Sequence, residues 1–344
     1  MIALIGIPSE PPIALVHRAL LDLDADCLFL NQRDFMSWDL ELAVDDHGLA
    51  GHLVYEQRII PLNRVTGIYA RPMDFHDLPE LRRESESSPH RQRCALLHDL
   101  ILRWMELAPG RVLNRPSAMA SNGSKPYQAQ LIREFGFHIP PTLVTDDPAA
   151  VLAFEREHRA LIYKSISGAR SIVRQFEPAD RVHLDRLRAC PVQFQARLEG
   201  TDVRVHVVGT DAFAVRATSA AVDYRYACRQ GESLEMTPIT LDAALHQRCV
   251  ALARGLGLDF AGIDLKFEPS GRISCFEVNP CPAFSFYEEN TGQPIAAAVA
   301  RYLADSAISN RLLPGTPPLV SPEPEPRVPD RPSRAVPVST ASAA

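Results

Sequence analysis

Three side chains that carry oxygen ligands have the types and the spacing of a magnesium site. Asp264 lies in a predicted strand, 260–267, and Glu277 and Asn279 lie in and just after the strand that follows, 272–278. Residues two apart on a strand face the same side, and a hairpin of these two strands can bring Asp264 beside that face. Magnesium takes such hard oxygen ligands and fills its remaining positions with water and phosphate. The alternative is the polar outer face of an ordinary hairpin.

Lysine is rare in this chain, which gives the few lysines some weight. Of 36 basic residues only Lys125, Lys164 and Lys266 are lysines. A compact ammonium acts on phosphate as a point charge, so a lysine retained among arginines indicates a site that a guanidinium cannot fill. Chance survival is the alternative.

Two of these lysines lie where phosphate could bind. Lys164 follows an apolar run and leads into a loop of small residues that includes Ser167, Gly168 and Ser171. Backbone amides of such a loop can approach phosphate oxygens closely, although a plain hairpin turn has the same composition. Lys125 opens a predicted helix, 124–135, whose N-terminus favours anions, although simple solvation of the first turn explains it as well.

Three arginines lie on or beside another predicted hairpin, formed by strands 202–208 and 212–218. They are Arg204, Arg216 and Arg225. The forked guanidinium recognises both phosphate and carboxylate. We expect Arg204 and Arg216 to contact a ligand, whereas most other arginines of the chain are surface residues.

The order of these motifs resembles the ATP-grasp superfamily. Within it, the chain is most similar to the RimK-type ligases and especially to the graspetide (microviridin-type) peptide maturases. The resemblance covers nearly all of residues 1–305 and rests on the two lysines, on Asp202-x-Arg204, and on Asp264 with Glu277-x-Asn279. Shorter matches lie at residues 69–72 (Tyr-Ala-Arg-Pro), 223–225 (Asp-Tyr-Arg), 276–280 (Phe-Glu-Val-Asn-Pro) and 288–292 (Glu-Glu-Asn-Thr-Gly).

The resemblance implies a role for each motif. Lys125 and Lys164 would hold the phosphates of ATP, and the loop 165–171 would close over them. Two magnesium ions would lie on Asp264, Glu277 and Asn279, and Arg204 and Arg216 would neutralise the transferring phosphoryl group. The segment 195–199 would form a hinge beside the nucleotide. Its backbone would contact adenine and its last side chain would bind the ribose; the residues are Gln195, Ala196, Arg197 and Leu198 for the base and Glu199 for the ribose.

The implied activity is that of an ATP-dependent ligase. A carboxylate attacks the γ-phosphate, and an amine or hydroxyl then displaces phosphate from the acyl phosphate, which needs positioning and electrostatics but no protein nucleophile. We expect a carboxylate-bearing peptide or amino acid as substrate, with Arg225 near it. The alternatives are a small-molecule ligase of the glutathione-synthetase type and a non-catalytic ATP-binding regulatory protein. Intact metal ligands favour a ligase over the regulatory protein.

The chain departs from the family at two places. Ala196 stands where the maturases commonly carry a glutamate, so the adenine hinge would rely more on backbone. Cys281-Pro282-Ala283-Phe284 replaces a polar-aromatic segment, which leaves the peptide substrate open. A cysteine between two prolines with no positioned histidine is more simply a packed residue than a nucleophile.

Apolar periodicity places these residues on a mixture of α/β and α+β elements. Strands at 1–7, 27–30, 67–71 and 111–114 alternate with helices marked by Ile13, Val16 and Leu20 and by Cys94, Leu97, Ile101, Trp104 and Ala108. Further elements are strands at 142–145, 161–166, 172–176 and 192–198 and helices near 148–158, 242–254 and 294–303.

From this pattern we predict four regions, together an ATP-grasp fold. They are an N-terminal parallel α/β domain (1–115), a nucleotide-clamping lid subdomain (116–190), a C-terminal subdomain with the metal site (191–310) and a disordered proline-rich tail (311–344).

Composition excludes several classes of protein. A net charge of −6 gives no basic field for nucleic acid, and no apolar run reaches the roughly 18 residues of a membrane span. Seven cysteines, an odd number without a Cys-x-x-Cys pair, favour a reduced cytoplasmic protein without disulfides or structural zinc. The sequence is compatible with a homo-oligomer.

Overall fold

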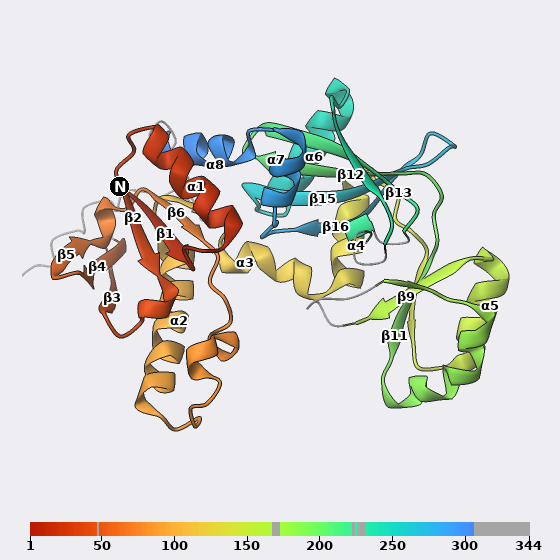
Figure 1. Cartoon of the computed structure of the whole chain (residues 1–344), viewed down its shortest axis with the longest axis horizontal. Coiled ribbons are helices and arrows are strands. Elements are labelled where there is room, and N and C mark those ends of the chain that lie inside the picture. The colour runs from red at the N-terminus through yellow and green to blue at the C-terminus, as the bar shows by residue number, and fades with distance from the viewer. Residues whose placement is uncertain (47, 167–172, 222–223, 226, 228–230, 306–344) are drawn as a thin grey trace, which may run out of the picture. The chain divides into compact units, whose positions relative to one another are not determined.

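A parallel sheet of four strands forms the N-terminal part of the chain, as the alternating apolar runs predicted. The computed structural model describes residues 1–46, 48–166, 173–221, 224–225, 227 and 231–305, and residues 1–311 cluster as one unit. The strands have the order β2-β1-β6-β7, with bounds β1 Ile2–Gly6, β2 Cys27–Asn31, β6 Gly67–Ala70 and β7 Arg111–Leu113 (Figure 1).

Helices cover both faces of this sheet, because its strands carry apolar side chains on both sides. Ile2 and Leu4 pack against α1 (Pro11–Asp22) and α8 (Ile295–Ala304), which lie side by side. Ala3 and Ile5 face α2 (Pro89–Leu107) on the other side. The period of two along β1 therefore divides the strand between two hydrophobic clusters.

A second, antiparallel sheet in this region was absent from our prediction. Its strands β3 (Trp38–Asp45), β4 (Gly48–Tyr55) and β5 (Arg58–Pro61) pair in that order. Trp38 and Leu40 alternate with exposed acidic residues and enter the same hydrophobic cluster as α2. That alternation is the sequence signal for a half-buried strand, and it would have predicted β3.

The chain next builds a four-stranded sheet in the order β10-β9-β11-β8. Its bounds are β8 Thr142–Thr145, β9 Leu161–Ser165, β10 Arg174–Gln175 and β11 Val192–Ala196. Helix α5 (Pro148–His158) covers it and begins as predicted, with Asp147 accepting a hydrogen bond from the amide of Ala149 at 2.9 Å. A 3-10 stretch at Pro178–Ala189, which the sequence did not predict, adds Leu184 and Leu187 to the core of this sheet.

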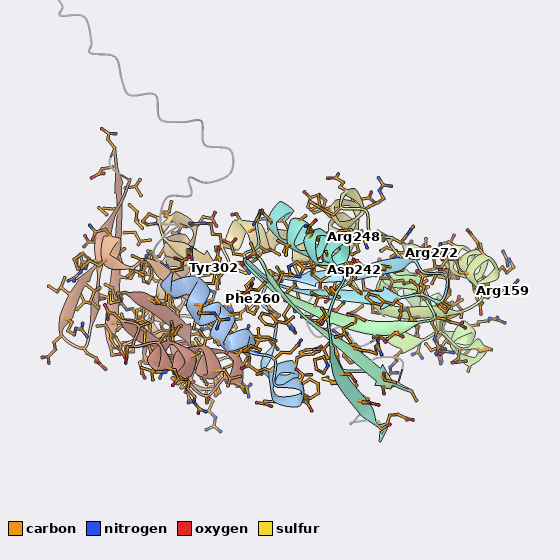
Figure 2. All side chains as sticks on the ribbon, turned by 90° about the horizontal axis from the view of Figure 1, so that it is seen from above. Arg159, Asp242, Arg248, Phe260, Arg272 and Tyr302 are labelled. Atoms are coloured by element: carbon orange, nitrogen blue, oxygen red, sulfur yellow. The ribbon has the colours of Figure 1, made fainter. Side chains whose placement is uncertain are left out.

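The largest sheet has five antiparallel strands in the order β14-β13-β12-β15-β16. They are β12 Thr201–Val208, β13 Asp211–Ser219, β14 Leu234–Ile239, β15 Phe260–Phe267 and β16 Ile273–Asn279. Both predicted hairpins, β12–β13 and β15–β16, are confirmed. Helices α4 (Lys125–Glu134) and α6 (Ala243–Gly255) bury one face, and Asp242 caps α6 beside Arg248 (Figure 2). The remaining helices are α3 (Pro116–Met119) and α7 (Ser285–Thr291).

Asn114 joins the N-terminal sheet to the five-stranded sheet. Its amide nitrogen donates to the carbonyls of Phe260 and Pro280 at 2.6 Å each, and its Oδ1 accepts from the amides of Asp259 and Phe260. The side chain is 2% exposed, and all of its polar atoms bond to backbone groups of these two segments. One side chain thereby fixes the start of β15 and the end of β16.

Two earlier expectations fall outside the described residues. These are the structure of the tail 311–344 and the placement of Ser167, Gly168 and Ser171 in the phosphate loop. The domain boundaries at 115, 190 and 310 stay predictions. Within the described part of the chain, no helix is both long and apolar enough to cross a membrane.

We predict that Asn114→Ala lowers the free energy of unfolding by about 3 kcal/mol, because four hydrogen bonds of a buried side chain to backbone groups are lost. Denaturant unfolding measures the change. Asn290→Ala is the control, since the exposed Asn290 makes one bond to the Phe286 carbonyl. Equal stability of the two variants would contradict the assigned role of Asn114.

Candidate active site

A cavity of about 340 Å³ lies between the four-stranded and the five-stranded sheets. Many residues predicted from the sequence line it: Lys164, Gln195, Arg197, Leu198, Glu199, Arg225, Asp264 and Glu277. Ile162 and Phe276 provide apolar walls, and Lys266 forms an ion pair with Asp202 at 2.8 Å on the same lining. The cavity thus combines apolar walls with both signs of charge.

The three predicted metal ligands are neighbours on β15 and β16. Asp264 pairs directly with Glu277, and Gly262 pairs with Asn279, with a register shift just after Asp264. Directly opposed side chains on antiparallel strands have Cβ atoms about 5 Å apart. This set combines two carboxylates with one amide. Within the described part of the chain, no cluster of three or more His, Cys, Asp or Glu side chains could hold a metal. The all-oxygen donors of the set fit magnesium.

Each of the two carboxylates is paired with a cation from another element. Lys125 Nζ lies 2.5 Å from Glu277 Oε2, and Arg204 Nη1 donates to Asp264 Oδ1 at 2.7 Å. Burial raises the pKa of the Glu277 carboxyl, but Lys125 and, more weakly, Lys164 outweigh burial and hold that pKa below its ordinary value. The Glu277 carboxylate therefore stays ionised at neutral pH.

Lys164 approaches the same carboxylate from the other sheet. It is 9% exposed at the end of β9, opposite Gln193 of β11. Burial lowers the pKa of Lys164, and the charge of Lys125 adds to that effect while Glu277 opposes it. Two ammonium groups near one carboxylate form a site with capacity for a further anion such as phosphate.

Arg204 is held in place by residues from several strands and one helix. Besides Asp264, its guanidinium contacts His206 Nε2 at 3.4 Å and lies 5.7 Å from the centre of the Tyr287 ring. Burial and the adjacent Arg204 lower the pKa of His206 well below its ordinary value, so the neutral imidazole can accept. A Cβ on residue 262 would lie 1.9 Å from Arg204 Nη2, so any larger residue than Gly262 would displace this guanidinium from its position.

Arg216 does not join this group, which corrects our expectation that it shares a ligand with Arg204. In the β12–β13 hairpin Arg204 pairs with Val215, whereas Arg216 pairs with Val203. Neighbouring residues of a strand point to opposite faces, so Arg216 lies on the face opposite Arg204 and is exposed. The sequence predicted both strands but not their register, and the register decides the face.

Two backbone amides of the predicted adenine hinge already donate hydrogen bonds to neighbouring segments. The amide of Ala196 donates to the Pro141 carbonyl and that of Arg197 to the Ala160 carbonyl, both at 2.9 Å. The side chain of Ala196 is buried, and that residue is not part of the cavity lining. Gln195, Arg197, Leu198 and Glu199 all line the cavity, and Leu198 and Glu199 follow directly after these bonds.

Gln128 contacts the strand of the predicted metal ligands, which our sequence reasoning missed. It is 1% exposed on α4, and its amide group donates to the Val278 carbonyl at 2.8 Å and accepts from the Val278 amide at 2.9 Å. Val278 lies between Glu277 and Asn279. The helix that carries Lys125 therefore also fixes the backbone of the strand with the predicted metal ligands. The only hint in the sequence was a glutamine on the buried face of an amphipathic helix.

Comparisons with known proteins agree with this architecture. Residues 187–303 match the model of the RimK-like ATP-grasp domain. A curated protein of Haemophilus ducreyi named "Probable alpha-L-glutamate ligase" is 27% identical over 203 residues, which span 56% of this chain and 65% of that protein. One of the same name from Sodalis glossinidius is 26% identical, over 59% of this chain and 71% of its own length.

Solved structures of peptide-modifying ligases are also similar. The ATP-grasp ligase PsnB, complexed with a phosphomimetic variant of its minimal precursor, Mg and ADP, has a TM-score of 0.70 at 27% identity, covering 88% of this chain and 97% of PsnB. A RiPP-associated ATP-grasp ligase of Chryseobacterium gregarium, in complex with ADP and a leader and core peptide, has a TM-score of 0.75 at 20% identity, covering 91% and 100%.

Fold and matched domain together show that this chain has the ATP-grasp fold and contains a RimK-like ATP-grasp domain at residues 187–303. The resemblance to the RimK-type group and to the graspetide type of ligase, expected from the sequence, is confirmed.

We predict that Gln128→Met lowers ATP turnover by about tenfold to a hundredfold, because small displacements of reacting groups have large effects on rate. Steady-state ADP release measures it, with thermal unfolding recorded in parallel. Gln130→Met is the matched control, an exposed glutamine on the same helix. Turnover that falls equally in both variants would contradict a specific role for Gln128.

Proposed function

We propose that this ligase activates a substrate carboxylate as an acyl phosphate and then forms an amide or ester bond. The observation that carries the proposal is the direct pairing of Asp264 with Glu277, each beside a cation, in a cavity that Lys164 also lines. Such a set of charges suits a nucleoside triphosphate and the charge that develops on the transferring phosphoryl group.

Lys125 and Lys164 would bind the phosphates of ATP, and the cavity wall from Gln195 to Glu199 would hold base and ribose. Asp264, Glu277 and Asn279 would hold two magnesium ions, which supply charge neutralisation at the phosphate oxygens. Lys125 would then exchange its bond with Glu277 for one with phosphate. Lys125 and Arg204, which would face phosphate, are the same cations that form ion pairs with Glu277 and Asp264.

Arg204 and Arg225 are the arginines that this proposal uses. Arg204 would stabilise the transferring phosphoryl group from its fixed position beside Asp264. Arg225 lines the cavity and would bind the carboxylate that attacks. Arg216 has no role here, because it lies on the other face of the sheet.

The bond changes balance without a protein nucleophile. A carboxylate oxygen attacks the γ-phosphorus, the bond to the β-phosphate oxygen breaks, and ADP leaves. The lone pair of an amine or hydroxyl then attacks the carbonyl carbon. Phosphate leaves with one former carboxylate oxygen, and the nucleophile loses its proton.

The similar proteins support a peptide or amino-acid substrate. PsnB was solved with a precursor peptide, and the curated relatives are named for glutamate. A regulatory ATP-binding protein without ligation is the competing account. It has no need of two carboxyl side chains opposite each other, and that pairing favours the ligase.

Trapping with hydroxylamine tests the activity. We expect ATP, magnesium and hydroxylamine to give a hydroxamate with L-glutamate or with a glutamate-containing peptide, together with ADP. Hydroxamate is diagnostic because hydroxylamine attacks an acyl phosphate but not a free carboxylate. Tight ATP binding without hydroxamate or stimulated ADP release across the panel would favour the regulatory account.

We predict that Asp264→Asn and Glu277→Gln each lower ADP formation at least about a hundredfold while the fold persists, because phosphoryl transfer depends on charge at these positions. Circular dichroism and ADP release are measured together. Glu268→Gln, in the turn of the same hairpin, is the control, with turnover near that of the unmodified protein. Normal turnover in either site variant would remove the metal assignment.

We predict that Lys164→Arg weakens ATP binding by about tenfold or more, because a planar fork does not fit the space of a buried ammonium. Calorimetry gives the affinity. Lys266→Arg is the matched control, since Lys266 lines the same cavity and an arginine can keep the ion pair with Asp202. If both variants bind ATP equally well, the argument from lysine scarcity fails.

A further inference from the structure

Tyr287 of α7 lies between two parts of the proposed active site. Helix α7 follows β16 in the chain and packs against β14, α1 and α8 (Figure 1). The side chain of Tyr287 is 6% exposed, its ring lies near Arg204, and its hydroxyl is bonded to that of Tyr224. One buried side chain therefore contacts both the arginine proposed for the phosphoryl group and the segment that carries Arg225.

The ring of Tyr287 helps to hold Arg204 in place. Its centre lies 5.7 Å from Arg204 Cζ and 4.9 Å from the centre of the His206 ring, with which it makes an edge-to-face contact. The face of an aromatic ring attracts a guanidinium, most strongly where water is excluded, and Arg204 is 5% exposed. The guanidinium is thus restricted by the Tyr287 ring in addition to its bonds with Asp264 and His206.

The hydroxyl of Tyr287 fixes Tyr224, which lines the cavity of the candidate active site together with Arg225. The two hydroxyl oxygens are 3.0 Å apart, and burial raises the pKa of both groups above its ordinary value. Both phenols therefore keep their protons at neutral pH, and one donates to the other. Adjacent Cα atoms are about 3.8 Å apart, so a fixed Tyr224 also limits where the side chain of Arg225 can reach.

The bond between Tyr224 and Tyr287 suits positioning better than stability. Tyr224 and Arg225 lie in the connection between β13 and β14. Ala227 of the same connection has no exposed surface, so the connection keeps a buried anchor when the hydroxyl bond is removed. Small displacements of a group that binds substrate have large effects on a reaction. We therefore expect loss of this bond to change substrate use more than stability.

We propose that Tyr287 positions both arginines of the reaction. Its ring keeps Arg204 beside Asp264. Its hydroxyl holds Tyr224, and thereby places Arg225 where it can bind the substrate carboxylate. Tyr287 is not part of the cavity lining, so it acts through these residues and not on the substrate itself. The inference rests on the proposed ligase function and makes recognition of the carboxylate depend on a side chain outside the cavity.

The test separates the hydroxyl of Tyr287 from its ring. Tyr287→Phe removes the hydroxyl alone, Tyr287→Leu removes the ring as well, and Tyr224→Phe removes the other end of the bond. Tyr163→Phe is the matched control, because that ring packs with Phe176 and Phe194 in the core of the four-stranded sheet and its hydroxyl forms no hydrogen bond with the described residues. Each variant is assayed for hydroxamate formation from L-glutamate or the glutamate-containing peptide, whichever reacts, with thermal unfolding and ATP affinity measured in parallel.

Loss of the hydroxyl should weaken use of the carboxylate and little else. We expect Tyr287→Phe to raise KM for the carboxylate by about fivefold, the contribution of one neutral hydrogen bond, with kcat and KM for ATP within about twofold. Tyr224→Phe should have the same effect. The double variant should be no worse than either single one, because both substitutions remove the same bond. Tyr163→Phe should match the unmodified protein.

Loss of the ring should lower kcat in addition. We expect Tyr287→Leu to lower kcat by about tenfold or more, because Arg204 loses one of its restraints beside the transferring phosphoryl group. Its ATP affinity should stay within about threefold, which shows that the cavity is folded. Tyr287→Phe keeps the ring and therefore keeps kcat. Tyr287→Met, whose flexible side chain adapts to the space that the ring leaves, replaces the leucine variant if that variant does not fold.

Four outcomes would overturn the inference. An unchanged KM in Tyr287→Phe contradicts the role of the hydroxyl. Effects of the two Phe substitutions that multiply in the double variant also contradict it, since Tyr224 would then contact the substrate by itself. A normal kcat without the ring contradicts the role of the ring, and equal losses in Tyr163→Phe would show a general effect of such substitutions. Absence of hydroxamate with the unmodified protein overturns the ligase function, and this inference with it.

Discussion

Asp264 and Glu277 lie directly opposite each other on neighbouring strands, and much of the structure follows from that placement. Like charges so close destabilise a sheet, the more so in a cleft with little water. The ion pairs with Lys125 and Arg204 offset this repulsion. The cations that offset this repulsion are the same groups that are proposed to bind phosphate, so binding would exchange one set of charge pairs for another.

Two distant segments and one nearby glycine hold that pair in position. Helix α4 brings both Lys125 and Gln128 to β16, Asn114 fixes the ends of β15 and β16, and Gly262 leaves room for Arg204. A buried polar side chain costs free energy when it loses its backbone partner. Each of these hydrogen bonds therefore also restricts the geometry of the strand it reaches. The five-stranded sheet thus carries the groups that are proposed to act in phosphoryl transfer.

Local patterns predicted most of the elements but few of the contacts between them. Periodicity and capping residues were enough for α5 and for both hairpins, because those signals lie within a few residues of each other. The roles of Gln128 and Asn114 rest on bonds across 150 and 146 positions, and no local pattern encodes such pairs. Arg216 was misplaced because one step of register moves a side chain to the other face. The β3–β5 sheet was missed although its alternation was readable.

Transfer of oxygen from substrate to phosphate tests the central claim most directly. The carboxylate that stimulates ADP release is prepared with ¹⁸O in both oxygens and turned over with ATP, and the released phosphate is examined by mass spectrometry. Attack of the carboxylate on the γ-phosphorus, followed by cleavage of the acyl bond, predicts one ¹⁸O atom in each phosphate formed in a single turnover. Phosphate without ¹⁸O, released together with ligated product, would contradict an acyl phosphate and with it the assignment of this cleft.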